Sequence, residues 1–240
     1  MNRSIADVYS AVPAAELKET GSGQGDAGLQ NPGAVLYRYM LGLYDFLERL
    51  NTRYPHILIE GCSGGGGRFD AGMLYYTPQI WCSDNTDAID RIRIQYGTSF
   101  GFPVSAVGSH VSASPSHQTG RRIPIKTRGV VAMAGSFGYE LNLDAVTASE
   151  KACIKEQIRD FHKYWDLIHN GDYYRLTNPF TDREAAAWLF ASEDKGEALL
   201  NVITLETHGN PLPICIKLKG LDPKASTGTK KQAGCTPAAR

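Results

Sequence analysis

The chain has 240 residues, 42% of them hydrophobic, and its 25 basic residues are balanced by 25 acidic ones. Disordered chains combine low hydrophobicity with high net charge, so this composition indicates a folded protein. The zero formal charge excludes a strongly basic nucleic-acid binder, and no apolar run reaches the length of about 18 residues that a membrane helix needs.

The cysteines and histidines show no metal-binding pattern. The five cysteines include no C-x-x-C pair, and the six histidines include no H-E-x-x-H motif. The chain also starts without the charged and apolar regions of a signal peptide. We therefore expect a protein of the reducing cytoplasm, with no metal and no membrane or nucleic-acid partner.

Predicted helices and short strands alternate through the first 171 residues. Apolar residues three and four positions apart predict a helix over 35–50, which Pro55 ends. Short apolar runs then predict buried strands at 56–60, 79–82, 104–111 and 130–134, and helical periods predict helices at 87–96 and 147–168. In the last helix the residues expected to face inward are Ile154, Ile158, Phe161, Trp165 and Ile168. This alternation predicts an α/β fold with parallel strands.

The pattern changes after Gly171. Apolar runs at 185–192, 198–205 and 214–218 are separated by turns too short to hold helices, which is typical of antiparallel hairpins. We therefore predict three parts: an α/β part over 1–171, an antiparallel β part over 172–225 and a disordered tail over 226–240. A glycine-rich stretch at 21–33 is predicted to be an exposed loop.

Reactive groups are expected after the predicted strands, because the loops that follow parallel strands meet at one rim. The four glycines at 64–67 allow a ligand to approach the backbone closely, or else form a flexible linker beside Cys62. Asp84 is either the N-cap of the next helix or a general acid whose carboxyl is desolvated by the neighbouring Trp81. Trp81 itself is either a core residue or a face for a sugar ring. Other polar candidates are Ser109, His110, His117 and Glu140, whereas Asp87 and Asp90 are predicted to be first-turn helix acids.

Several segments taken together resemble one enzyme family. They are Met1-Asn2-Arg3, CSGGGGRFD at 62–70, MLYYTPQ at 73–79, Trp81, SDNTDA at 83–88 and QYGTS at 95–99. Their order and spacing resemble glycoside hydrolase family 36, the melibiose- and raffinose-cleaving α-galactosidases, and the resemblance extends from Met1 to about Ala225.

The resemblance implies a (β/α)8 barrel followed by an antiparallel β domain, of which this chain holds strands five to eight and part of the β domain. It also implies retaining hydrolysis of terminal α-linked galactose from melibiose- and raffinose-type oligosaccharides, without a cofactor, by proteins that tend to form homo-oligomers. Asp84 matches the general acid/base of the family. Asn2, Cys62, Gly65 and Trp81 match its galactose contacts.

The resemblance also implies that the chain is a carboxyl-terminal portion. The family carries its nucleophile in a Lys-Trp-Asp-Met-Asn-Arg segment, which places that aspartate immediately before Met1. The tail over 226–240 has no counterpart in the family, as expected after a frame change. We therefore expect the chain alone to be inactive. Two other interpretations stay open: an inactive galactoside-binding or interaction fragment, and a transferase that passes galactose to another sugar.

Overall fold

The computed structural model describes residues 32–210, 213–222 and 228, which belong to two compact units. The first unit holds residues 32–59 and 70–78, and the second holds 60–69 and the described residues from 79 onward. The site residue Asn2, most of the predicted loop at 21–33 and nearly all of the predicted tail at 226–240 lie outside the described residues. No helix in the described residues is long and apolar enough to cross a membrane.

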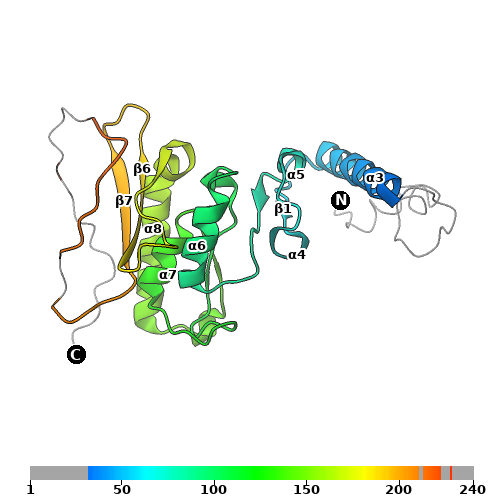
Figure 1. Cartoon of the computed structure of the whole chain (residues 1–240). Helices are drawn as coiled ribbons and strands as arrows, with labels where there is room; N and C mark the ends of the chain where they lie inside the picture. The colour runs from blue at the N-terminus through cyan, green and yellow to red at the C-terminus, as the bar shows by residue number, and fades with distance from the viewer. Residues whose placement is uncertain (1–31, 211–212, 223–227, 229–240) are drawn as a thin grey trace. The chain divides into compact units, whose positions relative to one another are not determined.

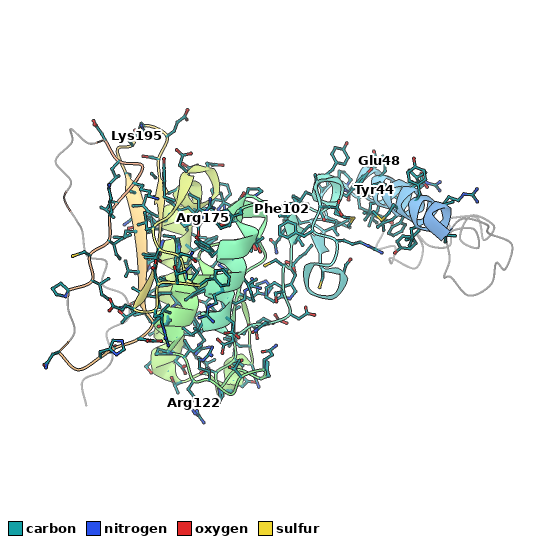
Figure 2. All side chains as sticks on the ribbon, in the orientation of Figure 1. Tyr44, Glu48, Phe102, Arg122, Arg175 and Lys195 are labelled. Carbon is teal, nitrogen blue, oxygen red and sulfur yellow. The ribbon has the colours of Figure 1, made fainter. Side chains whose placement is uncertain are left out.

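The first unit pairs two helices, α3 (Pro32–Arg53) and α5 (Ala71–Tyr76). The helix predicted over 35–50 is therefore confirmed, with three further residues at each end. Tyr44 of α3 stacks on Tyr76 of α5 with ring centroids 5.6 Å apart, and Asn51 donates a hydrogen bond of 3.1 Å to the Tyr76 carbonyl. Figure 2 labels Tyr44 and Glu48 on α3. Aromatic stacking and a side-chain hydrogen bond thus join the two helices.

Short parallel strands follow one another in chain order in the second unit. β1 (Glu60–Gly61) pairs with β2 (Gln79–Ile80), and β3 (His110–Ser112) pairs with β4 (Gly138–Glu140). An isolated parallel bridge between Ile80 and Val107 joins β2 to the segment that leads into β3. Between β2 and β3 the chain forms α6 (Ala88–Thr98) and the 3₁₀ turn η1 (Val104–Ala106); between β3 and β4 it forms α7 (Ile125–Ala132). These parallel pairings confirm the predicted α/β character.

A three-stranded antiparallel sheet ends the second unit, with its strands in the order β5 (Asp172–Arg175), β6 (Ala185–Ala191) and β7 (Ala198–Thr204). The hairpin of β6 and β7 was predicted, whereas β5 was not. The helix α8 (Ala148–Asn170) precedes the sheet and begins with a capping box between Thr147 and Glu150.

The core of the second unit lies between α6, α7, α8 and one face of the antiparallel sheet, as Figure 1 shows. Its buried side chains include Ala88, Ile92, Val131, Phe161, Ile168, Ala186, Trp188, Phe190 and Ile203. Arg175, labelled in Figure 2, ties β5 to the end of α6: its guanidinium donates to the Ser99 carbonyl at 3.1 Å and lies 4.1 Å from the centroid of Phe100. The antiparallel sheet is thus packed directly on the helices that follow the parallel strands.

Three predicted strands are wrong, and the one predicted at 104–111 is right only at its end, because residues 104–106 form the 3₁₀ turn η1 and only His110 and Val111 belong to β3. Residues 130–134 lie in α7 and the turn that ends it, because a short apolar run does not distinguish a buried helix from a strand. The parallel strand that follows is instead β4. In the run 56–60 only Glu60 pairs, and Ile57 and Leu58 are 51% and 87% exposed, since no described element covers them. Residues 214–218 adopt no regular structure.

The inward face of α8 is also partly wrong. Ile154, Phe161 and Ile168 are buried, but Ile158 and Trp165 are 40% and 47% exposed. The buried face of this helix instead includes Gln157, which lies three residues after Ile154 and four before Phe161. Ile158 and Trp165 therefore lie at the edge of the contact.

Candidate active site

Asp84 lies in the loop between β2 and α6, and its carboxyl is exposed among polar partners. The indole Nε1–H of Trp81 donates a hydrogen bond of 3.1 Å to Oδ1 of Asp84. The Sγ atom of Cys62, from the end of β1, lies 4.0 Å from the same oxygen. The Asp84 backbone carbonyl accepts a hydrogen bond of 2.9 Å from Gln118. The ends of two neighbouring parallel strands thus bring three predicted site residues, Cys62, Trp81 and Asp84, to one place.

The N-cap of α6 is Asp87, not Asp84. The Asp87 carboxylate accepts hydrogen bonds from the backbone N–H groups of Ile89 and Asp90, at 2.9 and 3.2 Å. Asp90 lies in the first turn, as predicted, whereas Asp87 occupies the cap itself. The helix therefore has its capping group without Asp84, which decides against the N-cap interpretation of that residue.

The buried Asp87 carboxylate is surrounded by donors. Thr119 donates to Oδ2, and the guanidinium of Arg121 forms an ion pair with Oδ1. Burial raises the pKa of Asp87, but the hydrogen bonds from Thr119 and from the backbone of Asp90 and Ile89, together with Arg121, outweigh it, so the pKa lies below its ordinary value of 3.8. The ionised form of Asp87 consequently ties the loop around Thr119 to the start of α6.

We expect Asp87→Asn to lower the free energy of unfolding of the chain by about 1–3 kcal/mol at pH 7, the contribution of hydrogen bonds to a charged group. Asparagine still caps the helix but cannot pair with Arg121. Because the folded-state pKa of Asp87 is depressed, its stabilisation is complete above pH 3.8 and is lost as the pH falls through the lowered value. Urea denaturation at pH 7 and pH 3 checks both statements.

The difference between Asp87→Asn and the unmutated chain is expected to shrink at the lower pH. Asp144→Asn, at an exposed position in the 3₁₀ turn η2 (Leu143–Ala145), serves as the matched control and is expected to change stability little at either pH. A destabilisation by Asp87→Asn that is the same at pH 7 and pH 3 would contradict the role of the ionised carboxylate.

The glycine segment after β1 is a left-handed turn rather than a flexible linker. Ser63, Gly64, Gly65 and Gly66 have φ values of 51°, 70°, 76° and 91°. The backbone N–H of Gly65 donates to the Cys62 Sγ atom at 3.4 Å. A Cβ atom on Gly65 would lie 2.9 Å from the backbone nitrogen of Asp84 and 3.3 Å from its Oδ2 atom. The glycines thus allow this turn to pass directly against Asp84.

Trp81 is buried, and polar groups surround its ring. It is 8% exposed, the imidazole of His110 stacks on it with centroids 4.7 Å apart, and the guanidinium of Arg91 lies 4.5 Å from its centroid. Arg91 in turn donates to the carbonyls of Gly108 and Ser83, at 2.6 and 3.1 Å. The structure therefore favours the core interpretation for the ring, while the indole N–H points to Asp84; stacking of a sugar on Trp81 stays a prediction.

The remaining polar candidates separate into two groups. His110 and Glu140 come together, with His110 Nδ1 3.3 Å from Glu140 Oε2. Ser109 is instead buried and donates to Gln95, and His117 is exposed. No group of three or more His, Cys, Asp or Glu residues in the described parts of the chain could hold a metal ion.

Sequence reasoning missed two residues that shape the site, Arg91 and Gln118. Arg91 lies on the buried face of α6 with Ala88 and Ile92, so a charged residue at helical spacing among apolar ones was the available signal. Gln118 is 34 residues from Asp84 in a loop, and its sequence neighbours carry no such signal.

Comparison with known proteins identifies the family. The melibiase family profile matches residues 14–171, and the profile of the glycosyl hydrolase family 36 C-terminal domain matches residues 185–226. The chain belongs to glycoside hydrolase family 36. Residues 172–184, which include β5, lie between the two matched regions, where the parallel part gives way to the antiparallel sheet.

The relatives within family 36 are named as α-galactosidases and are much longer than this chain. The bifunctional alpha-galactosidase/sucrose kinase AgaSK of Mediterraneibacter gnavus is 55% identical over 225 residues, which are 94% of this chain and 22% of that protein. Alpha-galactosidase AgaA of Geobacillus stearothermophilus is 47% identical over 223 residues, 92% and 28% of the two chains. This chain spans about a quarter of the length of these curated relatives.

Solved structures of family 36 proteins share the fold. The galactosidase domain of AgaSK superposes with a TM-score of 0.78 at 60% identity, over 80% of this chain and 26% of that one. A variant of AgaA in complex with raffinose superposes with a TM-score of 0.77 at 48% identity, over 81% and 27% of the two chains. Another AgaA variant has been crystallised with stachyose.

Proposed function

We propose that this chain acts in the retaining hydrolysis of terminal α-linked galactose and supplies the general acid/base, Asp84. The observation that carries the proposal is the position of the Asp84 carboxyl. It is exposed at the ends of two parallel strands, it is not used to cap α6, and it accepts a hydrogen bond from the indole of Trp81. Membership of family 36 supports the same assignment.

The proposed architecture is the second half of a (β/α)8 barrel, strands five to eight, over 1–171, followed by a partial antiparallel domain over 172–225. Two features support it. The parallel strands β1 to β4 follow one another in chain order, and helices connect them, as in a barrel. Asp84 and Cys62 then lie at the carboxyl ends of their strands, where barrel enzymes carry their reactive groups.

The two oxygens of Asp84 are proposed to have different tasks. Oδ1 accepts from the Trp81 N–H and faces the Cys62 thiol, so it is committed as an acceptor. Oδ2 lies over Gly65, where no side chain obstructs it. We assign the transferable proton to Oδ2. The protonated carboxyl gives this proton to the glycosidic oxygen as the bond from that oxygen to the anomeric carbon breaks.

A second carboxylate completes the double displacement. The two carboxyl groups of retaining glycosidases lie about 5–5.5 Å apart, and the second one attacks the anomeric carbon and forms a covalent galactosyl intermediate. Ionised Asp84 then takes a proton from a water molecule, whose oxygen attacks the same carbon and releases galactose with its original configuration. We assign this second carboxylate to the aspartate that the family carries beside the segment Met1-Asn2-Arg3.

Cys62, Gly65, Trp81 and Asn2 are proposed to contact the galactose. For the first three, their proximity to the Asp84 carboxyl supports this role, because a terminal sugar held there is within reach of the acid. We take α-galactosides of the raffinose type as the substrate class, since a related enzyme has been crystallised with raffinose. The binding fragment without turnover remains the second candidate, because the same residues could hold galactose without a nucleophile.

A segment exchange tests the proposal. The segment of AgaSK that aligns with this chain is replaced by the aligned residues of this chain, so that the recipient supplies the rest of the protein. We expect the chimera to hydrolyse raffinose and to release α-galactose as the first product, as followed by proton NMR. Release of β-galactose would contradict the retaining mechanism. A folded chimera that binds galactose saturably without hydrolysis would favour the binding fragment.

A further inference from the structure

We propose that His110 is a positioning residue, which holds the indole of Trp81 in the orientation from which its N–H reaches Asp84. This inference rests on the proposed function of Asp84. The imidazole of His110 stacks on the indole with an interplanar angle of 18° and a centroid distance of 4.7 Å. The nearly parallel rings leave little freedom for the indole to rotate, so the stack determines where the Trp81 N–H points.

His110 is itself held from two sides by β4. Its Nδ1 atom lies 3.3 Å from Oε2 of Glu140, and the Cδ2 edge of its ring lies against Gly138, where an added Cβ atom would come within 3.1 Å. Parallel pairing of β3 with β4 sets this arrangement, because His110 is opposite Gly138 in the register and Glu140 follows two residues later on the same side. The sheet therefore fixes the imidazole, and the imidazole fixes the indole.

The position of the indole ring determines where its N–H meets the Asp84 carboxyl. Its ring also meets the guanidinium of Arg91 at 4.5 Å, and Arg91 is anchored by backbone carbonyls. With the ring held by His110 and Arg91, the Nε1–H stays 3.1 Å from Oδ1 of Asp84. A donor that is fixed at Oδ1 keeps the other oxygen available for the proton. His110 thus acts on the acid step through Trp81 and does not touch the carboxyl in this arrangement.

The indole N–H signal of Trp81 in the 240-residue chain, labelled with 15N-tryptophan, provides the test. The three tryptophans give three indole signals, and Trp81→Phe identifies the relevant one. We expect His110→Ala and Asp84→Ala each to shift this signal and to speed its exchange with solvent about tenfold, as expected when one hydrogen bond is lost. We expect His110→Phe, which keeps a flat ring on the indole, to leave the signal near its original position.

The chain contains a matched control on α8. The rings of Trp165 and His169 stack with the same interplanar angle, 18°, at a centroid distance of 4.5 Å, on a part of the helix where Trp165 is 47% exposed. We expect His169→Ala to leave the Trp81 signal unchanged. Glu140→Ala removes the partner of His110 at a side chain that is 68% exposed, and we expect it to move the Trp81 signal in the same direction as His110→Ala, but less.

Three outcomes would overturn the proposal. One is a Trp81 signal that does not respond to His110→Ala, and another is a signal that does not respond to Asp84→Ala. The third is a His110→Phe variant that behaves like His110→Ala. That result would mean that a contact specific to the imidazole, and not the stacked ring, acts on the indole. These readouts need no catalysis.

Kinetics of the chimera provide a second readout. His110→Ala is expected to lower kcat for raffinose about tenfold with little change in KM. An unchanged rate for Asp84→Asn would count against the proposed function alone.

Discussion

Replacing Asp84 by Asn in the chimera is expected to lower kcat/KM for raffinose by about 10²–10⁴-fold, the usual contribution of a positioned general acid or base. The amide is nearly the same size as the carboxyl and can still accept from the Trp81 N–H, so binding and folding should change little. It cannot give a proton to the glycosidic oxygen. Steady-state kinetics with raffinose and a melting temperature for each variant measure the two effects separately.

Substrates with different leaving groups distinguish a general acid from other roles of Asp84. Dinitrophenolate leaves without a proton, so the first step with dinitrophenyl α-galactoside should be nearly unaffected in Asp84→Asn, and the intermediate should accumulate. Azide should then react with that intermediate in Asp84→Ala, where it needs no general base, and give α-galactosyl azide. A β-galactosyl azide would instead identify Asp84 as the nucleophile. Equal losses on both substrates would refute the acid role.

The matched control for Asp84→Asn is Asp144→Asn, an exposed carboxyl in η2. It removes the same charge from a position away from the proposed acid, so its activity on raffinose should stay within about twofold of the unmutated chimera, as for most surface substitutions. A comparable loss in Asp144→Asn would indicate a general effect of charge on the chimera.

Gly65→Ala should be the second most damaging change. A Cβ atom there would lie 2.9 Å from the Asp84 backbone nitrogen and 3.2 Å from its Cγ atom, so either the turn or Asp84 must move. Displacing a reacting group by about 1 Å costs roughly 100-fold in rate. We therefore expect kcat for raffinose in the chimera to fall about 100-fold.

Gly64→Ala is the matched control for Gly65→Ala. Both residues have positive φ values, 70° and 76°, but an added Cβ atom on Gly64 would have nothing within 4 Å. Each substitution carries a backbone strain of about 1–2 kcal/mol. A lower melting temperature is thus expected for both variants, and a large loss of activity only for Gly65→Ala. Equal activities in the two variants would show that the approach of Gly65 to Asp84 does not matter.

The long elements were predictable because their signals are local. The helices α3 and α8 and the hairpin of β6 and β7 each extend over enough residues for a period to be evident. The strands β1, β2, β3 and β4 have only two or three residues each, and their limits depend on which backbone groups find partners across the chain. The apolar run at 130–134, which lies in α7 and the turn that ends it, was mistaken for a strand because a short apolar run does not distinguish the two.

The roles of Asp84 and Asp87 could be distinguished only from the tertiary structure. Asp84 and Asp87 are three residues apart; the sequence offered Asp84 as a cap of the helix and predicted Asp87 to be a first-turn acid. Asp87 is the cap because its carboxylate accepts from the backbone N–H groups of Ile89 and Asp90, and Arg121 and Thr119, more than 30 residues away, bind the same carboxylate. The Asp84 side chain is not the cap and is exposed.

The amino-acid sequence was sufficient for the family, the α/β character and the candidates Cys62, Gly65, Trp81 and Asp84, because these follow from motifs and from periods within short stretches. The stacking of His110 on Trp81, and the passage of the glycine turn over Asp84, followed only from the folded arrangement. The physical reason is that each depends on backbone pairing between strands remote in sequence: β3 with β4 fixes His110, and β1 with β2 places the turn against Asp84.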